Sequence, residues 1–154
     1  MRRAAPALFL LLLCACDTEL SLAVEVASAT AGVRGDVVEI EVVCDVRVGT
    51  YALAGDDFIL PQASIVVDGV PVAEVSLERP EGFSGRLEPG ESTQVTTQGS
   101  VPLSAFPSTR DRVCGQSVVE VSVQYQAEQQ PDDPLDPPVR AIGAAQGEAT
   151  VRCD

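Results

Sequence analysis

Histidine, lysine and tryptophan are absent from this chain of 154 residues, and two tyrosines and four phenylalanines are its only aromatic residues. Without histidine the chain can form neither a Ser-His-Asp nor a Cys-His catalytic arrangement, and it lacks imidazole as a metal ligand. Without lysine it has no Ser-Lys dyad and no Schiff base. Paired carboxylates remain conceivable for acid–base chemistry, but so few aromatic residues offer little to line a sugar-binding cleft. We therefore expect a protein that is not an enzyme.

Positive charge is also scarce, because ten arginines stand against 23 acidic residues and the formal net charge is −13. Nucleic acid binds to clusters of positive charge, so we expect no nucleic-acid partner. Anionic lipid headgroups would be repelled as well, so attachment to a membrane needs a source other than a basic patch. The acidic surface favours cationic partners or metal ions. The alternative is that the charge only keeps the protein soluble.

One apolar run follows Arg2 and Arg3 and ends in Leu-Cys-Ala-Cys at residues 13–16. A positive start, a short apolar stretch and small residues before a cut are the layout of an export signal. The run is about half as long as the roughly 20 residues that a membrane-spanning helix needs. Its last four residues resemble the bacterial lipobox, in which the cysteine after the cut receives lipid. The resemblance implies a lipoprotein that is acylated, for example with palmitate, at Cys16.

Two other interpretations of this segment stay open. A standard signal peptidase would also accept a cut after Ala15, with no lipid added. Cys14 is a second candidate for the lipid, although Leu13 would then stand where a small residue is wanted. We favour a signal peptide over residues 1–15, a lipid-anchored tether over 16–19 and one domain over 20–154, which is long enough for its own core. The lipid would hold this domain at a membrane of the bacterial cell envelope, facing the periplasm or the exterior.

The remainder of the chain alternates between apolar and polar residues. Within Val38–Val46 and Val119–Tyr125 every second residue is apolar or aromatic, as in a strand with one buried face. Asp68-Gly69 favours a tight hairpin turn, and no window shows a helical stripe of useful length. We expect an all-β fold, a single immunoglobulin-like antiparallel β-sandwich made of two sheets. Its seven or so strands are expected near residues 20–28, 36–48, 58–67, 70–78, 92–101, 117–127 and 147–153.

Three short motifs rich in turn residues follow one another along the chain, at Gly35–Ile40, Val66–Ala73 and Leu87–Thr93. The order resembles bacterial immunoglobulin-like modules of the CARDB adhesion-related type. It is also similar to the late-embryogenesis-abundant β-sandwich of the water-stress group. The resemblance covers roughly residues 22–106, and it departs from both families at residues 47–50, where their asparagine-rich turn is absent. It implies a sandwich with a non-catalytic role and identifies no ligand.

Three cysteines follow the expected signal segment. An exported chain meets oxidising conditions, so we expect one disulfide and one free thiol. If the last two expected strands form an antiparallel hairpin in which Val121 faces Val151, Cys114 and Cys153 lie close together at one end of it. We therefore favour the Cys114–Cys153 pair, with Cys44–Cys153, Cys44–Cys114 or no bridge as alternatives. Cys44 falls in the apolar phase of its strand, which indicates a buried thiol.

Acidic residues gather in two expected loops, and clustered carboxylate oxygens are the ligands that calcium prefers. Neither cluster has the spacing of a known calcium-binding loop, so calcium is a secondary hypothesis and no other cofactor is expected. The favoured function is a membrane-anchored, non-catalytic lipoprotein that acts as a protein-interaction or structural module, with an envelope protein as its partner. The alternative is a small-ligand or calcium-binding lipoprotein. The candidate calcium ligands are Asp56, Asp57, Asp132, Asp133 and Asp136.

Overall fold

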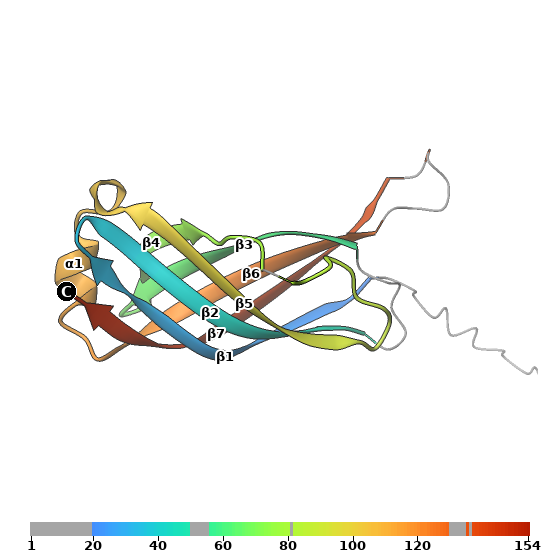
Figure 1. Cartoon of the computed structure of the whole chain (residues 1–154), viewed down its shortest axis with the longest axis horizontal. Coiled ribbons are helices and arrows are strands. Elements are labelled where there is room, and N and C mark those ends of the chain that lie inside the picture. The colour runs from blue at the N-terminus through green and yellow to red at the C-terminus, as the bar shows by residue number, and fades with distance from the viewer. Residues whose placement is uncertain (1–19, 50–55, 81, 130–134, 136) are drawn as a thin grey trace, which may run out of the picture.

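A computed structural model describes residues 20–49, 56–80, 82–129, 135 and 137–154, and for residues 56–60 it describes the backbone alone. Its seven strands confirm the all-β prediction (Figure 1). Two short helical segments, η1 (Leu103–Ala105) and α1 (Thr109–Val113), were not predicted. Segments of three and five residues are too short to show a helical period in the sequence. The strands are β1 (Leu22–Arg34), β2 (Val37–Val48), β3 (Asp56–Val67), β4 (Val70–Ser76), β5 (Ser92–Pro102), β6 (Val118–Gln129) and β7 (Val139–Cys153).

All seven strands belong to one curled sheet in the order β4-β3-β6-β7-β1-β2-β5. Neighbours are antiparallel except β1 and β7, which run parallel. Residues Ala29–Val33 of β1 pair with both β2 and β7, whereas Leu22–Val26 pair with β2 alone, beyond a bulge at Val26–Ser28. The curled sheet therefore forms a sandwich with a β4-β3-β6-β7 layer and a β1-β2-β5 layer. Its two layers are joined through β1. The sequence had suggested two separate sheets, and the structure has one continuous sheet instead.

Glycines on β7 let the first half of β1 lie across that strand. A Cβ atom placed on Gly143 would stand 2.6 Å from Cγ2 of Val24, and one placed on Gly147 would stand 2.7 Å from Cβ of Val26. The valine side chains thus fill the space that these two glycines leave open. Farther along β1, a Cβ on Gly32 would overlap the carbonyl oxygen of Arg152 in β7. The two layers can meet along β1 because these positions have no side chain.

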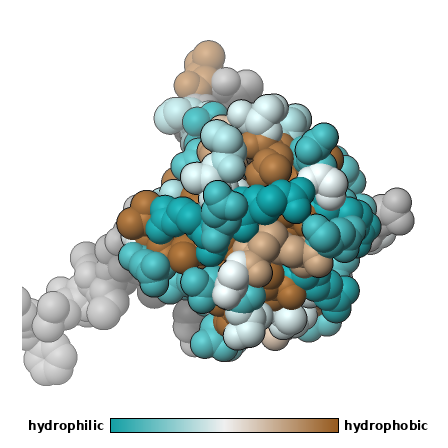
Figure 2. All heavy atoms as spheres, turned by 90° about the vertical axis from the view of Figure 1, so that its left-hand side faces the viewer, coloured by the Kyte–Doolittle hydropathy of each residue, from teal (hydrophilic) through white to brown (hydrophobic). Residues whose placement is uncertain are grey.

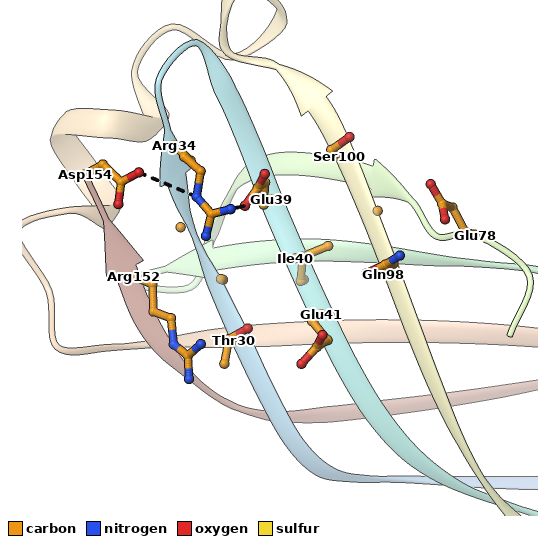
Figure 3. Close-up of a pocket in the computed structure, with 13 residues that line it drawn as sticks. Thr30, Arg34, Glu39, Ile40, Glu41, Glu78, Gln98, Ser100, Arg152 and Asp154 are labelled. Carbon is orange, nitrogen blue, oxygen red and sulfur yellow. Dashed lines mark ion pairs between the residues drawn. The ribbon is translucent and has the colours of Figure 1, made fainter. Parts of the chain in front are cut away.

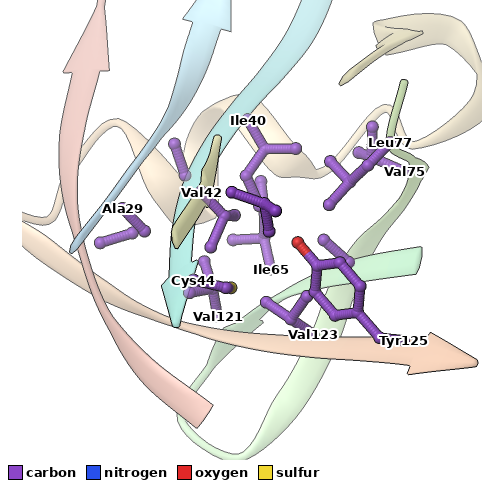
Figure 4. Close-up of a cluster of buried hydrophobic side chains, with 14 of the residues drawn as sticks. Ala29, Ile40, Val42, Cys44, Ile65, Val75, Leu77, Val121, Val123 and Tyr125 are labelled. Carbon is purple, nitrogen blue, oxygen red and sulfur yellow. The ribbon is translucent and has the colours of Figure 1, made fainter. Parts of the chain in front are cut away.

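Small aliphatic side chains fill the space between the layers. The inward positions of β2, every second residue from Val38 to Val48, are each no more than 2% exposed, which confirms the alternation expected for this strand. Figure 4 shows Val42 of β2 with Ile65 of β3 and Val121 of β6 in the same cluster. Branched side chains suit the pleated surface of a sheet, and each one fully buried stabilises the fold by about 1.5–3 kcal/mol.

The β3–β4 hairpin has the turn that its sequence predicted. Asp68 and Gly69 both have positive φ angles, 53° and 73°, as a tight two-residue hairpin turn requires. Pro71 follows in β4, which lies at one end of the sheet. A strand at the edge tolerates proline because the missing N–H is not needed for a second neighbour.

The β6–β7 hairpin differs from the expectation in its register. Val121 pairs with Gly147, not with Val151. The ladder ends where Val118 of β6 pairs with Thr150 of β7, one residue before Val151. β7 also begins at Val139, well before the expected start at residue 147, so the connection after β6 is shorter than the one that the expected strands 117–127 and 147–153 leave. The early part of β7 is rich in alanine and glycine, so it carries no period-two pattern of apolar and polar residues.

Gly32→Ala tests the join between the layers. Because the backbone of β7 has no room for a methyl group at this position, we expect the variant to lose about 2–3 kcal/mol of its free energy of unfolding. Gly115→Ala is the matched control, since the nearest atom to its added Cβ, the Asp111 carbonyl oxygen, stands 3.8 Å away. Urea denaturation followed by circular dichroism measures both, and equal stability of the two variants would contradict the role assigned to Gly32.

Candidate functional site

The disulfide joins Cys114 to Cys153, the pair favoured from the sequence, with a Cα–Cα distance of 5.7 Å. Cys114 follows α1 directly, and its N–H donates to the carbonyl oxygen of Arg110. Thr109 of α1 is buried and donates from its hydroxyl to the Val72 carbonyl oxygen at 2.8 Å. The bridge and this hydrogen bond fasten the crossover between β5 and β6 to one end of the sandwich. The pairing is correct although the hairpin register that suggested it was wrong.

The free thiol of Cys44 is fully buried, as predicted. Burial raises its pKa above the ordinary value, the hydrogen bond to Tyr125 opposes that shift, and the charge of Asp45 adds to it. Burial likewise raises the pKa of Tyr125, whose hydroxyl lies 3.4 Å from that of Thr97. A buried neutral thiol is a poor nucleophile, so Cys44 is a core residue.

Several predicted site residues fall outside the described structure. Cys16 precedes it, and Asp132, Asp133 and Asp136 also lie outside the described residues. Asp56 and Asp57 begin β3, where only the backbone is described. Within the described part of the chain, no three His, Cys, Asp or Glu side chains are grouped to hold a metal ion, so calcium binding stays a prediction. No helix in that part is long and apolar enough to cross a membrane.

A hollow of about 420 Å³ lies on the outer face of the β1-β2-β5 layer (Figure 3). Arg34 stands at one side of it, 3.7 Å from a carboxylate oxygen of Glu39 and 3.5 Å from one of Asp154. These ion pairs are exposed, so each contributes about 0–1 kcal/mol. Small molecules usually bind in concave pockets lined mostly by apolar side chains. This open, charged hollow is better suited to surface contact.

A second hollow, of about 450 Å³, runs beside β5. The segment Glu78–Pro80 with Gly82 and Phe83 forms one side of it, and Thr93–Gln98 of β5 forms the other. Because β5 is the last strand of the sheet, one edge of its backbone lies next to this hollow. This hollow was not predicted from the sequence. A signal was present, since the whole of Ser92–Pro102 contains no charged residue.

No match was found among protein-family models or among curated protein sequences. Two solved structures are similar in backbone arrangement. A crystal structure of a protein from Archaeoglobus fulgidus is 16% identical, has a TM-score of 0.41 and aligns over 84% of this chain and 96% of its own. The solution structure of a CARDB domain from Pyrococcus furiosus is 13% identical, with a TM-score of 0.32 over 86% of this chain and 95% of its own. Neither assigns a function to this chain.

Removal of the disulfide tests how strongly it holds the crossover. Its cysteines are separated by 39 residues, and on the chain-entropy model a loop of that length contributes about 4 kcal/mol. We expect the double variant Cys114→Ser/Cys153→Ser to lose roughly that much stability in urea denaturation. Cys44→Ala leaves the bridge intact and is the control for loss of a cysteine. A double variant as stable as the parent chain would contradict this role.

Proposed function

We propose that this chain is a non-catalytic lipoprotein of the bacterial cell envelope, and that its β-sandwich is a protein-interaction or structural module held at a membrane. The observation that carries the proposal is a tightly packed all-β scaffold whose hollows, among the described residues, are open and polar. The absence of histidine and lysine from the whole chain supports a role without catalysis.

The path of the chain supports an orientation at the membrane. Leu20 is buried against the core. β1 begins two residues later, at the end of the sandwich where the β6–β7 hairpin projects, opposite α1 (Figure 1). A lipid on Cys16 leaves a tether over residues 16–19, which spans at most roughly 14 Å when extended. The hairpin end would then face the bilayer and the α1 end would face away from it. A partner so close to the membrane is expected to be a membrane protein or another nearby envelope component.

The charge of the molecule supports a cationic partner. The net charge of −13 creates a field that attracts positively charged surfaces and speeds their association. The same charge opposes direct adsorption to anionic lipid. The acyl chain would therefore provide the membrane attachment, and the folded domain would remain available to a protein.

Cys16→Ser tests the anchor. We expect this variant to move from the membrane fraction to the soluble fraction, because the serine hydroxyl cannot replace the thiol that receives the lipid. Incorporation of a labelled fatty acid should be lost at the same time. Cys14→Ser is the matched control and should keep both the label and the membrane location. Acylation that survives in Cys16→Ser would contradict the proposal.

Photo-cross-linking in cells tests the interaction. A photoreactive residue placed at Asp68, in the β3–β4 turn, or at Leu135, in the β6–β7 hairpin, samples the two ends of the sandwich. Amine-reactive reagents would miss this chain because it has no lysine. We expect one dominant envelope protein in the adducts, identified by mass spectrometry, and fewer adducts with the Cys16→Ser chain. Tight binding of calcium or a small molecule without any protein adduct would overturn the proposal in favour of a ligand-binding lipoprotein.

A further inference from the structure

β5 has an unpaired edge. Among the described residues it lies last in the sheet, and its strand partner along its length is β2 alone. The carbonyl oxygen of Gln98 accepts a hydrogen bond of 2.6 Å from the N–H of Glu78, which is not part of β2. In an antiparallel strand the N–H and C=O of one residue point to the same side, and successive residues alternate. The backbone groups of Gln94 and Thr96 therefore point away from β2, as those of Gln98 do.

These outward groups are available for hydrogen bonding. Within the part of the chain that the structure describes, no hydrogen bond reaches the backbone N–H or C=O of Gln94 or Thr96 on that side. The hollow beside Thr93–Gln98 leaves space next to them. A row of unpaired backbone groups at a sheet edge is a template for a further strand. Gln98, already bound to Glu78, marks the end of the open stretch.

The two edges of the sheet are protected differently. β4, at the other edge, carries Pro71 and Glu74, and proline and charge are the usual means of preventing edge-to-edge pairing. β5 has no charged residue, and its only proline is Pro102 at its very end. Charged residues make up 21% of the chain, so their absence from eleven consecutive edge positions sets β5 apart. An unprotected edge in an exported protein fits a binding function.

We propose that β5 binds an extended, basic peptide segment of an envelope protein by strand addition, which deepens and rests on the proposed interaction function. Glu41 of β2 lies directly opposite Gln98, and Glu78 lies on the other side of it. Both glutamates line the hollow of Figure 3, and neither forms an ion pair with a described residue. Glu78 therefore leaves negative charge at the end of the open edge, and Glu41, one strand farther from that edge, adds to the negative field there. Arg79 also lines the β5 hollow, with its guanidinium group close to Gly85. Its positive charge partly offsets the negative charge of Glu78, so the attraction of a basic segment depends mainly on the net charge of −13.

A second copy of this chain is the less suitable occupant. Pairing of two β5 edges would bring together two molecules that each carry a net charge of −13. It would also place the Glu78 side chains of both copies near the same interface. Like charges across an interface oppose association. Lysine or arginine side chains on an added strand would instead be attracted by Glu78 and by the net negative charge of the molecule.

Hydrogen exchange of individual amides provides a direct test on the full chain in detergent micelles. The probe is an eight-residue peptide of alternating valine and lysine, and the same peptide with glutamate in place of lysine is its control. We expect the valine–lysine peptide to slow exchange at Gln94 and Thr96 about tenfold, because their N–H groups gain partners. Exchange at Val95 and Thr97, already bonded to β2, should not change. Equal effects of both peptides, or no slowing at the two outward amides, would overturn the proposal.

Two variants separate binding from folding. Thr96→Pro removes an outward N–H and leaves the bonds to β2 intact, whereas Thr96→Arg keeps the N–H and adds a charge that repels a basic strand. Both should abolish the slowing at Gln94, and Ser64→Arg, on the opposite layer, should not. Urea denaturation shows whether each variant folds. If Thr96→Pro does not, Thr96→Arg decides the matter, and binding that survives in folded Thr96→Arg contradicts the proposal.

A photoreactive residue at Gln94 in cells identifies the natural occupant. We expect an adduct with an envelope protein whose cross-linked peptide is rich in lysine or arginine. The adduct should be lost in the Thr96→Arg variant. An adduct to a second copy of this chain, or to an acidic segment, overturns the proposal. If Asp68 or Leu135 yields a partner and Gln94 yields none, the edge proposal fails while the interaction function stands. If none of the three positions yields an adduct, both fail.

Discussion

The close parallel contact between β1 and β7 is the constraint on which the rest of the structure depends. Because Gly32 has no side chain, the backbone of β1 can pair with the carboxyl-terminal part of β7 and with β2 at once. This pairing joins the two layers of the sandwich. The disulfide to Cys153 acts at the same place, since Cys153 pairs with Val33 of β1 and ties the crossover of α1 to it.

The two ends of the sandwich differ as a consequence. At the α1 end, Arg110 donates to the carbonyl oxygens of Gly35 and Asp154, and Thr109 donates to that of Val72. Side chains, backbone and the disulfide thus lock this end. At the other end β1 leaves β7 and the β6–β7 hairpin projects (Figure 1). The chain enters at this end, so a lipid-anchored molecule would present its locked end and its long strands, including β5, away from the bilayer.

The surface of the molecule has the polarity that such a presentation needs. In the end-on view of Figure 2, hydrophilic side chains surround smaller apolar areas, and no single large apolar face is visible. Polar and charged groups control the rate and the specificity of association more than its affinity. Affinity at the β5 edge would come from backbone hydrogen bonds, which every extended peptide can make. Under that proposal, selection among peptides would depend on charge, with Glu78 at the edge and the net charge of the molecule as its sources.

Sequence patterns predicted the features that depend on neighbouring residues. Alternation indicated the strands and the burial of Cys44, and Asp68-Gly69 indicated its turn, because each signal is contained in a few consecutive residues. Alanine and glycine in the early part of β7 gave no such signal, so the hairpin register was missed. The disulfide partner was predicted because Cys114 and Cys153 lie near one end of the hairpin in either register.

The sequence by itself determined the all-β character, the Asp68-Gly69 turn, the acidity and the absence of histidine and lysine, and it predicts the lipid anchor at Cys16. Only the tertiary structure decided which strands are neighbours. The fit of Gly32 against Arg152, and of Gly143 and Gly147 against β1, involves residues more than a hundred positions apart, so no local pattern reports it. The open edge of β5 has the same origin. A strand becomes an edge only when all the other strands have found their partners.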